Sequence, residues 1–153
     1  MDYEKKLLDK GLALPFPPKP VATYVSAVRT GNLLFLSGML PFVDGKLAFE
    51  GKVGKELTVE QGQKAAQIAL LNALAVIKAE AGGLEQVRRI VRISVHVASA
   101  PGFTQQPAVA NGASDLLVHL FGEAGRHARL ALGAAELPLN APVELEMIVE
   151  VAG

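Results

Sequence analysis

The stretch GRHARLALGAAELPLNAPVELEM, residues 125–147, predicts two short β-strands joined by a connection that contains proline. Arg129 enters the first strand, and the carboxylates Glu144 and Glu146 lie in the second. A guanidinium offers a planar pair of N–H donors to a carboxylate, and a nearby side-chain carboxylate can orient water. We therefore expect one arginine facing one glutamate in a site that holds a small carboxylic acid and delivers water to it.

Strict alternation of apolar side chains extends this prediction to further strands. In residues 143–151 the odd positions are apolar, and the even positions hold Glu144, Glu146, Ile148 and Glu150. Residues 87–98 are expected to point Val91, Ile93, Val95 and Val97 to one face and Arg92, Ser94 and His96 to the other. Shorter strands are predicted at 128–134, 21–28 and 33–37, with an irregular excursion over 41–54 that turns at Asp44-Gly45.

Two amphipathic helices are predicted between the strands. Thr58-Val-Glu-Gln61 is a capping box, and the helix that it begins runs to about Ala81, before Gly82-Gly83. A second helix spans roughly Pro107–Phe121, with its proline in the first turn. A short helix at 2–10, ended by Gly11, and an extended PFPPKP segment at 15–20 precede the first strand.

This order of elements predicts a two-layer α+β domain, a mixed sheet with two helices on one face. The opposite face is expected to carry Arg92, Ser94, His96, Glu146 and Glu150. Such a face meets either water or another subunit. Because half of the residues are hydrophobic and the mean hydropathy is +0.32, we expect another subunit.

Composition narrows the class of protein. The 153 residues are expected to form a single domain, with 1–20 as an N-terminal extension. The 15 basic and 15 acidic residues balance, which argues against a nucleic-acid partner because phosphate binding needs a basic face. Cysteine is absent, so disulfides, thiolate nucleophiles and zinc–thiolate sites are excluded. The longest apolar region, 65–79, is interrupted by polar residues, and 1–11 lacks a signal-peptide core, so we expect a cytoplasmic protein without a membrane partner.

Two motifs resemble those of one family. Residues 31–41, GNLLFLSGMLP, resemble the early strand and turn of the YjgF/RidA (endoribonuclease L-PSP) family, and Ala128-Arg129, Leu137-Pro138 and 143–146 resemble its C-terminal signature. The resemblance covers roughly 21–151 and indicates a divergent branch. It implies a chorismate-mutase-like fold assembled as a homotrimer, with three sheets around a central barrel and ligand clefts between neighbouring subunits.

The resemblance also implies an activity. Characterised relatives hydrolyse reactive enamines and imines derived from amino acids to a 2-oxo acid and ammonia, without a cofactor or a metal. By this resemblance, Arg129 binds the carboxylate of a small metabolite, and Glu144 holds or activates water. The remaining residues expected to border the cleft are Tyr24, Ser37, Gly38 and Asn111.

Simpler interpretations stay open for each residue. Arg129 could instead pair with Glu144, Glu146 or Glu123, and Tyr24, Ser37-Gly38 and Asn111 could be ordinary packing, turn and solvated residues. His96, His119 and His127 have no metal-ligand spacing. His127 near the cleft could tune its charge, but a surface role is expected. For the whole protein, the alternative is a trimer that binds a small carboxylate without turnover, and ribonuclease activity ranks last because no basic run or histidine pair is present.

Overall fold

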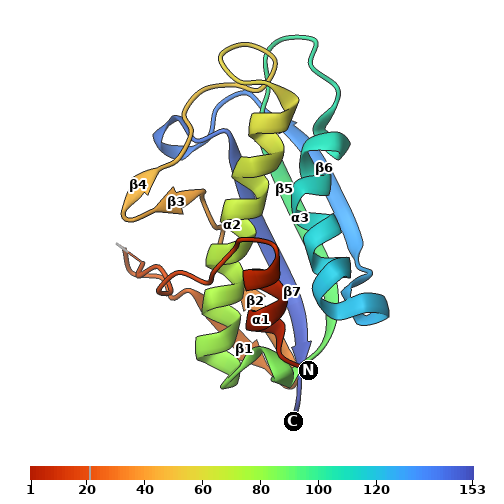
Figure 1. Cartoon of the computed structure of the whole chain (residues 1–153). Coiled ribbons are helices and arrows are strands. Elements are labelled where there is room, and N and C mark those ends of the chain that lie inside the picture. Colours follow the sequence, from red (N-terminus) through yellow and green to blue (C-terminus); the bar gives the residue numbers. More distant parts are fainter. Residues whose placement is uncertain (21) are drawn as a thin grey trace.

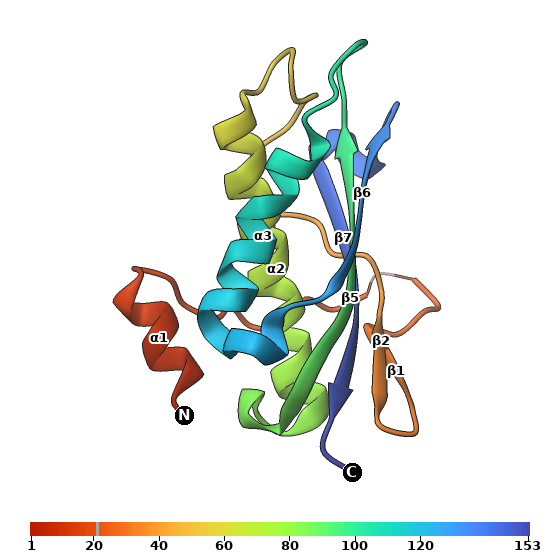
Figure 2. The same ribbon diagram turned by 90° about the vertical axis from the view of Figure 1, so that its right-hand side faces the viewer.

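A five-stranded mixed sheet with helices on one face forms the body of the protein (Figures 1 and 2). The structure, a computed structural model, describes residues 1–20 and 22–153. The strands follow the order β1-β2-β7-β5-β6, and only β5 and β6 are parallel neighbours among these pairs. Their bounds are β1 Ala27–Thr30, β2 Leu33–Leu36, β5 Val87–Ala98, β6 Ala128–Ala134 and β7 Val143–Val151. A separate hairpin contains β3 Phe42–Val43 and β4 Lys46–Leu47.

Helices α2 (Val59–Ala81) and α3 (Gln106–Phe121) pack side by side on this sheet face (Figure 2). The predicted capping box is confirmed, since Gln61 N–H donates to Thr58 Oγ1 at 3.1 Å and Thr58 N–H donates to Gln61 Oε1 at 2.9 Å. The helices approach closely at Gly112 of α3, where a Cβ would collide with the backbone of Gln63 in α2. The predicted two-layer α+β architecture is therefore confirmed.

A third helix, α1 (Tyr3–Asp9), lies outside the helical layer (Figure 2). Its Leu7 is fully buried, and the Tyr3 ring packs at a tilt of 41° against Phe121 at the end of α3, with 4.8 Å between the ring centroids. Glu4 forms a 2.6 Å ion pair with Lys78 of α2. Short 3₁₀ turns follow α2 (η1, Leu84–Gln86), α3 (η2, Gly122–Gly125) and β6 (η3, Pro138–Asn140). None of the helices in 1–20 and 22–153 has the length and apolar character that a bilayer span requires.

Two strand predictions need correction. The first strand begins at Ala27, so residues 22–26 of the predicted span are not part of it, because its partner β2 ends at Leu36 and these residues have no strand among the described ones to pair with. The predicted start, Val21, lies outside the described residues. In β5, register shifts against β7 bring Ile90, not Val91, into the core. The predicted irregular excursion contains the β3–β4 hairpin, which turns at Asp44 and Gly45.

The sheet face away from the helices is open in the single chain. It carries Arg92, His96 and Glu146, as predicted, and also apolar side chains that are about half exposed. These apolar residues are Val28, Phe35, Leu130 and Leu132. The open face therefore combines charged groups with apolar surface that no element of the described chain covers.

Candidate functional site

Glu144 lies on the open face of β7, at a cavity of about 450 Å³. The cavity is bounded by β7, by the segment that follows β2, and by the lead-in at 18–20. Of the predicted site residues, the structure brings four together here: Tyr24, Ser37, Gly38 and Glu144. A volume of this size suits a small metabolite.

Backbone geometry brings the Glu144 side chain beside Gly38. Met39 and Leu145 exchange two backbone hydrogen bonds, of 2.7 and 3.0 Å, and these hold the Ser37-Gly38 turn beside β7. A Cβ on residue 38 would lie 2.9 Å from Glu144 Cδ, closer than real Cβ contacts allow. Glycine at position 38 therefore creates the space that the carboxylate occupies.

Burial raises the pKa of the Glu144 carboxyl above its ordinary value. The charge of His96, its cross-strand neighbour, lowers the pKa, and that of Glu146 raises it. A carboxyl group with a raised pKa in a cavity is a candidate for proton transfer near neutral pH.

The other cavity residues act in different ways. The Ser37 hydroxyl donates to the Val25 carbonyl at 2.6 Å, so its oxygen remains an acceptor for a ligand. Tyr24 is 53% exposed at the rim, which leaves its ring accessible to a bound molecule. The sequence indicates Asn72 of α2 only as one of the polar interruptions of an apolar helix. In the structure its buried amide donates to the carbonyls of Leu40 and Phe42, both at 3.1 Å, and these bonds hold the cavity wall in place.

Arg129 and Asn111 meet at a second place, between β6 and α3. Arg129 Nη1 donates to Asn111 Oδ1 at 2.7 Å and to Ser114 Oγ at 3.1 Å. A guanidinium has five N–H donors, so the Nε–Nη2 edge can still bind a carboxylate through two parallel bonds. Both partners of Arg129 are neutral, and Glu123 pairs with Arg126 at 4.0 Å. The alternative interpretation of Arg129 as the partner of Glu123, Glu144 or Glu146 is wrong for the described chain.

Arg129 and Glu144 do not face each other within one chain, and their expected pairing across a boundary between subunits stays a prediction. Strand β5 lies between β6 and β7. Arg129 is in register with Ile93, which is buried under the helices, whereas Glu144 is opposite His96 on the open face. One chain therefore carries two half-sites, a cationic one with Arg129 and Asn111 and a carboxylate one with Glu144.

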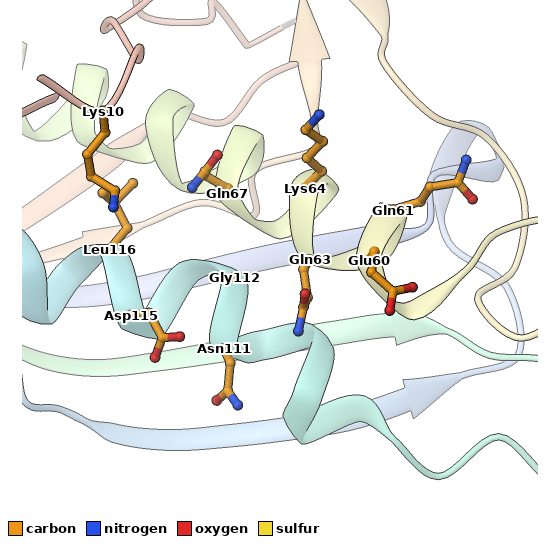
Figure 3. Close-up of a pocket in the computed structure, with 10 residues that line it drawn as sticks. All are labelled: Lys10, Glu60, Gln61, Gln63, Lys64, Gln67, Asn111, Gly112, Asp115 and Leu116. Carbon is orange, nitrogen blue, oxygen red and sulfur yellow. The ribbon is translucent and has the colours of Figure 1, made fainter. Parts of the chain in front are cut away.

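A polar groove of about 490 Å³ runs between α2 and α3 (Figure 3). Lysines and carboxylates both border it, among them Lys64, Glu60 and Asp115. These mixed charges select no single class of ligand. Asn111 lies at its edge, and Figure 3 shows its side chain directed away from α2, on the side of α3 that faces β6.

Ser114 and His127 were not predicted as site residues. His127 Nε2 lies 2.9 Å from Ser114 Oγ, so the expected surface role for this half-buried histidine is wrong. Thirteen positions separate the two residues, and the turn η2 brings them together, which spacing alone does not indicate. The available signal was Asn111 and Ser114, two polar residues one helical turn apart beside the apolar stripe of α3.

Fold and site geometry together define a YjgF-like α+β protein. The family model described as "YjgF/chorismate_mutase-like, putative endoribonuclease" matches residues 4–151, so the chain belongs to this family. The family resemblance found in the sequence is confirmed.

Individual relatives agree with this assignment. Protein TCP17 of Trypanosoma cruzi is 45% identical over 141 residues, covering 92% of this chain and 88% of the relative. A 2-iminobutanoate/2-iminopropanoate deaminase of Dermatophagoides farinae is 30% identical over 139 residues, covering 90% of this chain and 93% of the relative. The crystal structure of Atu1372 from Agrobacterium tumefaciens, a protein of unknown function, superimposes on this chain with a TM-score of 0.93 and 44% sequence identity. The match covers 97% of this chain and 92% of Atu1372.

Proposed function

We propose that this protein hydrolyses reactive enamines and imines derived from amino acids, giving a 2-oxo acid and ammonia. The observation that carries the proposal is the half-buried Glu144 carboxylate, held against Gly38 in a cavity of metabolite size. The 30% identical relative named as a 2-iminobutanoate/2-iminopropanoate deaminase supports the substrate class.

We further propose that the protein acts as a homotrimer with clefts between subunits. The separation of Arg129 and Glu144 on opposite faces of the sheet supports this assembly, because two subunits can bring together what one chain keeps apart. The half-exposed apolar residues on the open face, including Phe35 and Leu132, also favour burial against another subunit.

In the proposed mechanism, Arg129 of one subunit binds the substrate carboxylate. Glu144 of its neighbour accepts a proton from water as the water oxygen bonds to the C=N carbon. Glu144 then returns this proton to nitrogen, which gives a carbinolamine. Glu144 next takes the hydroxyl proton and passes it to nitrogen, so that the C–N bond breaks, the C=O bond forms and ammonia leaves. An enamine first tautomerises to the imine, as its carbon gains a proton and its nitrogen loses one. Because imines already hydrolyse in water, orientation of the substrate and one group that relays protons, Glu144, supply what the reaction needs.

A trapping assay tests this function. An amino-acid oxidase generates 2-iminopropanoate, semicarbazide traps it, and active protein competes by releasing pyruvate and ammonia. Glu144→Gln should abolish the competition, whereas Glu150→Gln, a matched change on the same strand and face, should not. Wild-type protein that binds 2-oxobutanoate through Arg129 but never competes would support the alternative, a regulatory trimer that binds carboxylates.

A further inference from the structure

Arg129 is the first member of a chain of hydrogen bonds that ends at the backbone of η2. Its Nη1 donates to Ser114 Oγ at 3.1 Å, and Ser114 Oγ lies 2.9 Å from His127 Nε2. The other ring nitrogen, His127 Nδ1, lies 2.6 Å from the Gly125 carbonyl oxygen. Asn111 Oδ1 holds the same Nη1 from a second side at 2.7 Å.

Elementary bonding rules fix the direction of this chain. A carbonyl oxygen only accepts, so His127 Nδ1 must carry the hydrogen that it shares with Gly125. In the neutral ring Nε2 is then an acceptor, and it takes the Ser114 hydroxyl hydrogen. That leaves a Ser114 lone pair for the Arg129 N–H. Every donor in the chain meets one acceptor only while His127 is neutral.

The end of the chain is anchored in the protein interior. Gly125 is buried against α3, where a Cβ would lie 2.8 Å from the Leu117 carbonyl carbon. Ser114 is 9% exposed and comes from the same helix. The carbonyl that orients the histidine and the hydroxyl that follows it are therefore both fixed to α3.

We propose that Ser114 and His127 are positioning residues that hold the Arg129 guanidinium for carboxylate binding, and that they do so only while His127 is neutral. This rests on the proposed role of Arg129 as the carboxylate-binding group. A protonated ring would donate from Nε2 to Ser114 Oγ, which already accepts from Arg129. The Ser114 hydrogen would lose its acceptor, and a second cation would stand beside the guanidinium.

The surroundings of His127 favour the neutral ring. Burial lowers the pKa of the His127 imidazole, the bond to the Gly125 carbonyl raises it, and the charge of Arg129 lowers it, for a net decrease. The other charged or titratable residues on the elements packed around it are Glu123 of η2, Arg126 directly after η2, Asp115 and His119 of α3, and Arg88, Arg89, Arg92 and His96 of β5. Glu123 and Arg126 pair with each other, and Arg129 is the charged group whose field shifts the His127 pKa.

Calorimetric titration of 2-oxobutanoate into the intact protein between pH 5.5 and 8 tests the proposal. Because the pKa of His127 is lowered, we expect wild-type affinity to fall only below the ordinary histidine pKa of about 6.5. Ser114→Ala should bind about five- to ten-fold more weakly at pH 8, as for the loss of one hydrogen bond of ordinary strength. The glutamine in His127→Gln keeps a hydrogen-bond acceptor but cannot titrate. This variant should therefore bind 2-oxobutanoate well, and its affinity should not fall at low pH. Equal affinity of Ser114→Ala and wild type, or an unchanged pH profile in His127→Gln, would overturn the proposal.

Two controls keep this result separate from the proposed function. If Arg129→Ala binds 2-oxobutanoate as tightly as wild type, the role of Arg129 fails, and the proposed function fails with it. If only Arg129→Ala loses binding, the positioning roles alone are wrong. Nitrogen-15 spectra of wild-type protein at pH 8, with His127 assigned from triple-resonance spectra of the wild type itself, should show the Nδ1–H tautomer. An Nε2–H tautomer would contradict the chain of hydrogen bonds even if the variants misfold.

Discussion

At the scale of single residues, Gly38 determines where the Glu144 carboxylate can lie. Its φ is not in the positive region, so the backbone accepts alanine, and the collision falls on the end of the Glu144 side chain. We expect Gly38→Ala to displace the carboxylate and lower kcat about ten- to a hundred-fold, the range that small misplacements of catalytic groups produce. Steady-state kinetics with 2-iminopropanoate measures this, and an unchanged kcat with an intact fold would contradict the proposed role of the turn.

The ionised Glu144 carboxylate should also lower the free energy of unfolding at neutral pH, relative to the protonated form at low pH. Its pKa is raised in the folded protein, so the folded state binds more protons than the unfolded state once the pH exceeds the ordinary value near 4.5. The contribution of this carboxyl group to the free energy of unfolding is therefore present at low pH, and it is lost as the pH rises through the pKa that Glu144 has in the folded protein. Glu144→Gln removes that loss, so its Tm relative to wild type should be higher at pH 8 than at pH 4. Thermal melts at both pH values check the sign, and a Tm difference that falls with pH would be the opposite result.

At the scale of elements, the contact between α2 and α3 depends on Gly112. Alanine normally stabilises a helix by about 1 kcal/mol relative to glycine. Here the new Cβ would meet the Gln63 backbone, which cannot rotate away, so we expect Gly112→Ala to lower the free energy of unfolding by about 1–3 kcal/mol. Urea unfolding at fixed protein concentration measures the change.

Gly62 of α2 provides the matched comparison for this helix contact. The atoms nearest to its added Cβ would be side-chain methyls of Val53 and Val109, at 3.1–3.2 Å, and these can shift. Gly62→Ala should therefore cost less stability than Gly112→Ala. Equal losses at the two positions would show that close backbone approach at Gly112 is not the cause.

The elements also show what the sequence could predict. Strands β5, β6 and β7 have the predicted bounds, because alternation along each strand needs no knowledge of its neighbours. The start of β1 depends on where its partner β2 ends. The burial of Ile90 in the core in place of Val91 depends on register shifts of β5 against β7. Neither property is encoded in the strand's own pattern.

The candidate site, likewise, could be predicted from the sequence only in part. Tyr24, Ser37, Gly38 and Glu144 come together as family motifs indicate. The separation of Arg129 and Glu144 within one chain could not be predicted from the strand patterns, because it depends on β5 lying between their strands and on which face each side chain takes. Ser114 and His127 required the path of η2, which no local signal specifies.

At the scale of the whole molecule, the two half-sites predict complementation between subunits. Arg129→Ala and Glu144→Gln proteins should each be inactive alone. After equal amounts are unfolded together and refolded, about a quarter of the clefts in a cyclic trimer should pair an intact Arg129 with an intact Glu144. The recovered activity, measured by the trapping assay, should approach that fraction of wild type. A mixture that stays inactive although mass spectrometry shows mixed trimers would contradict a cleft shared between subunits.

The placement of Arg129 and Glu144 on opposite faces of one sheet has a kinetic consequence. If each cleft draws on two chains, dilution separates the binding group from the water-activating group, even though every chain stays folded. Specific activity would then decline below the dissociation constant of the assembly and recover on concentration. The rate at a fixed substrate level would rise faster than linearly with the amount of protein, so that synthesis of the chain itself sets a threshold for its chemistry.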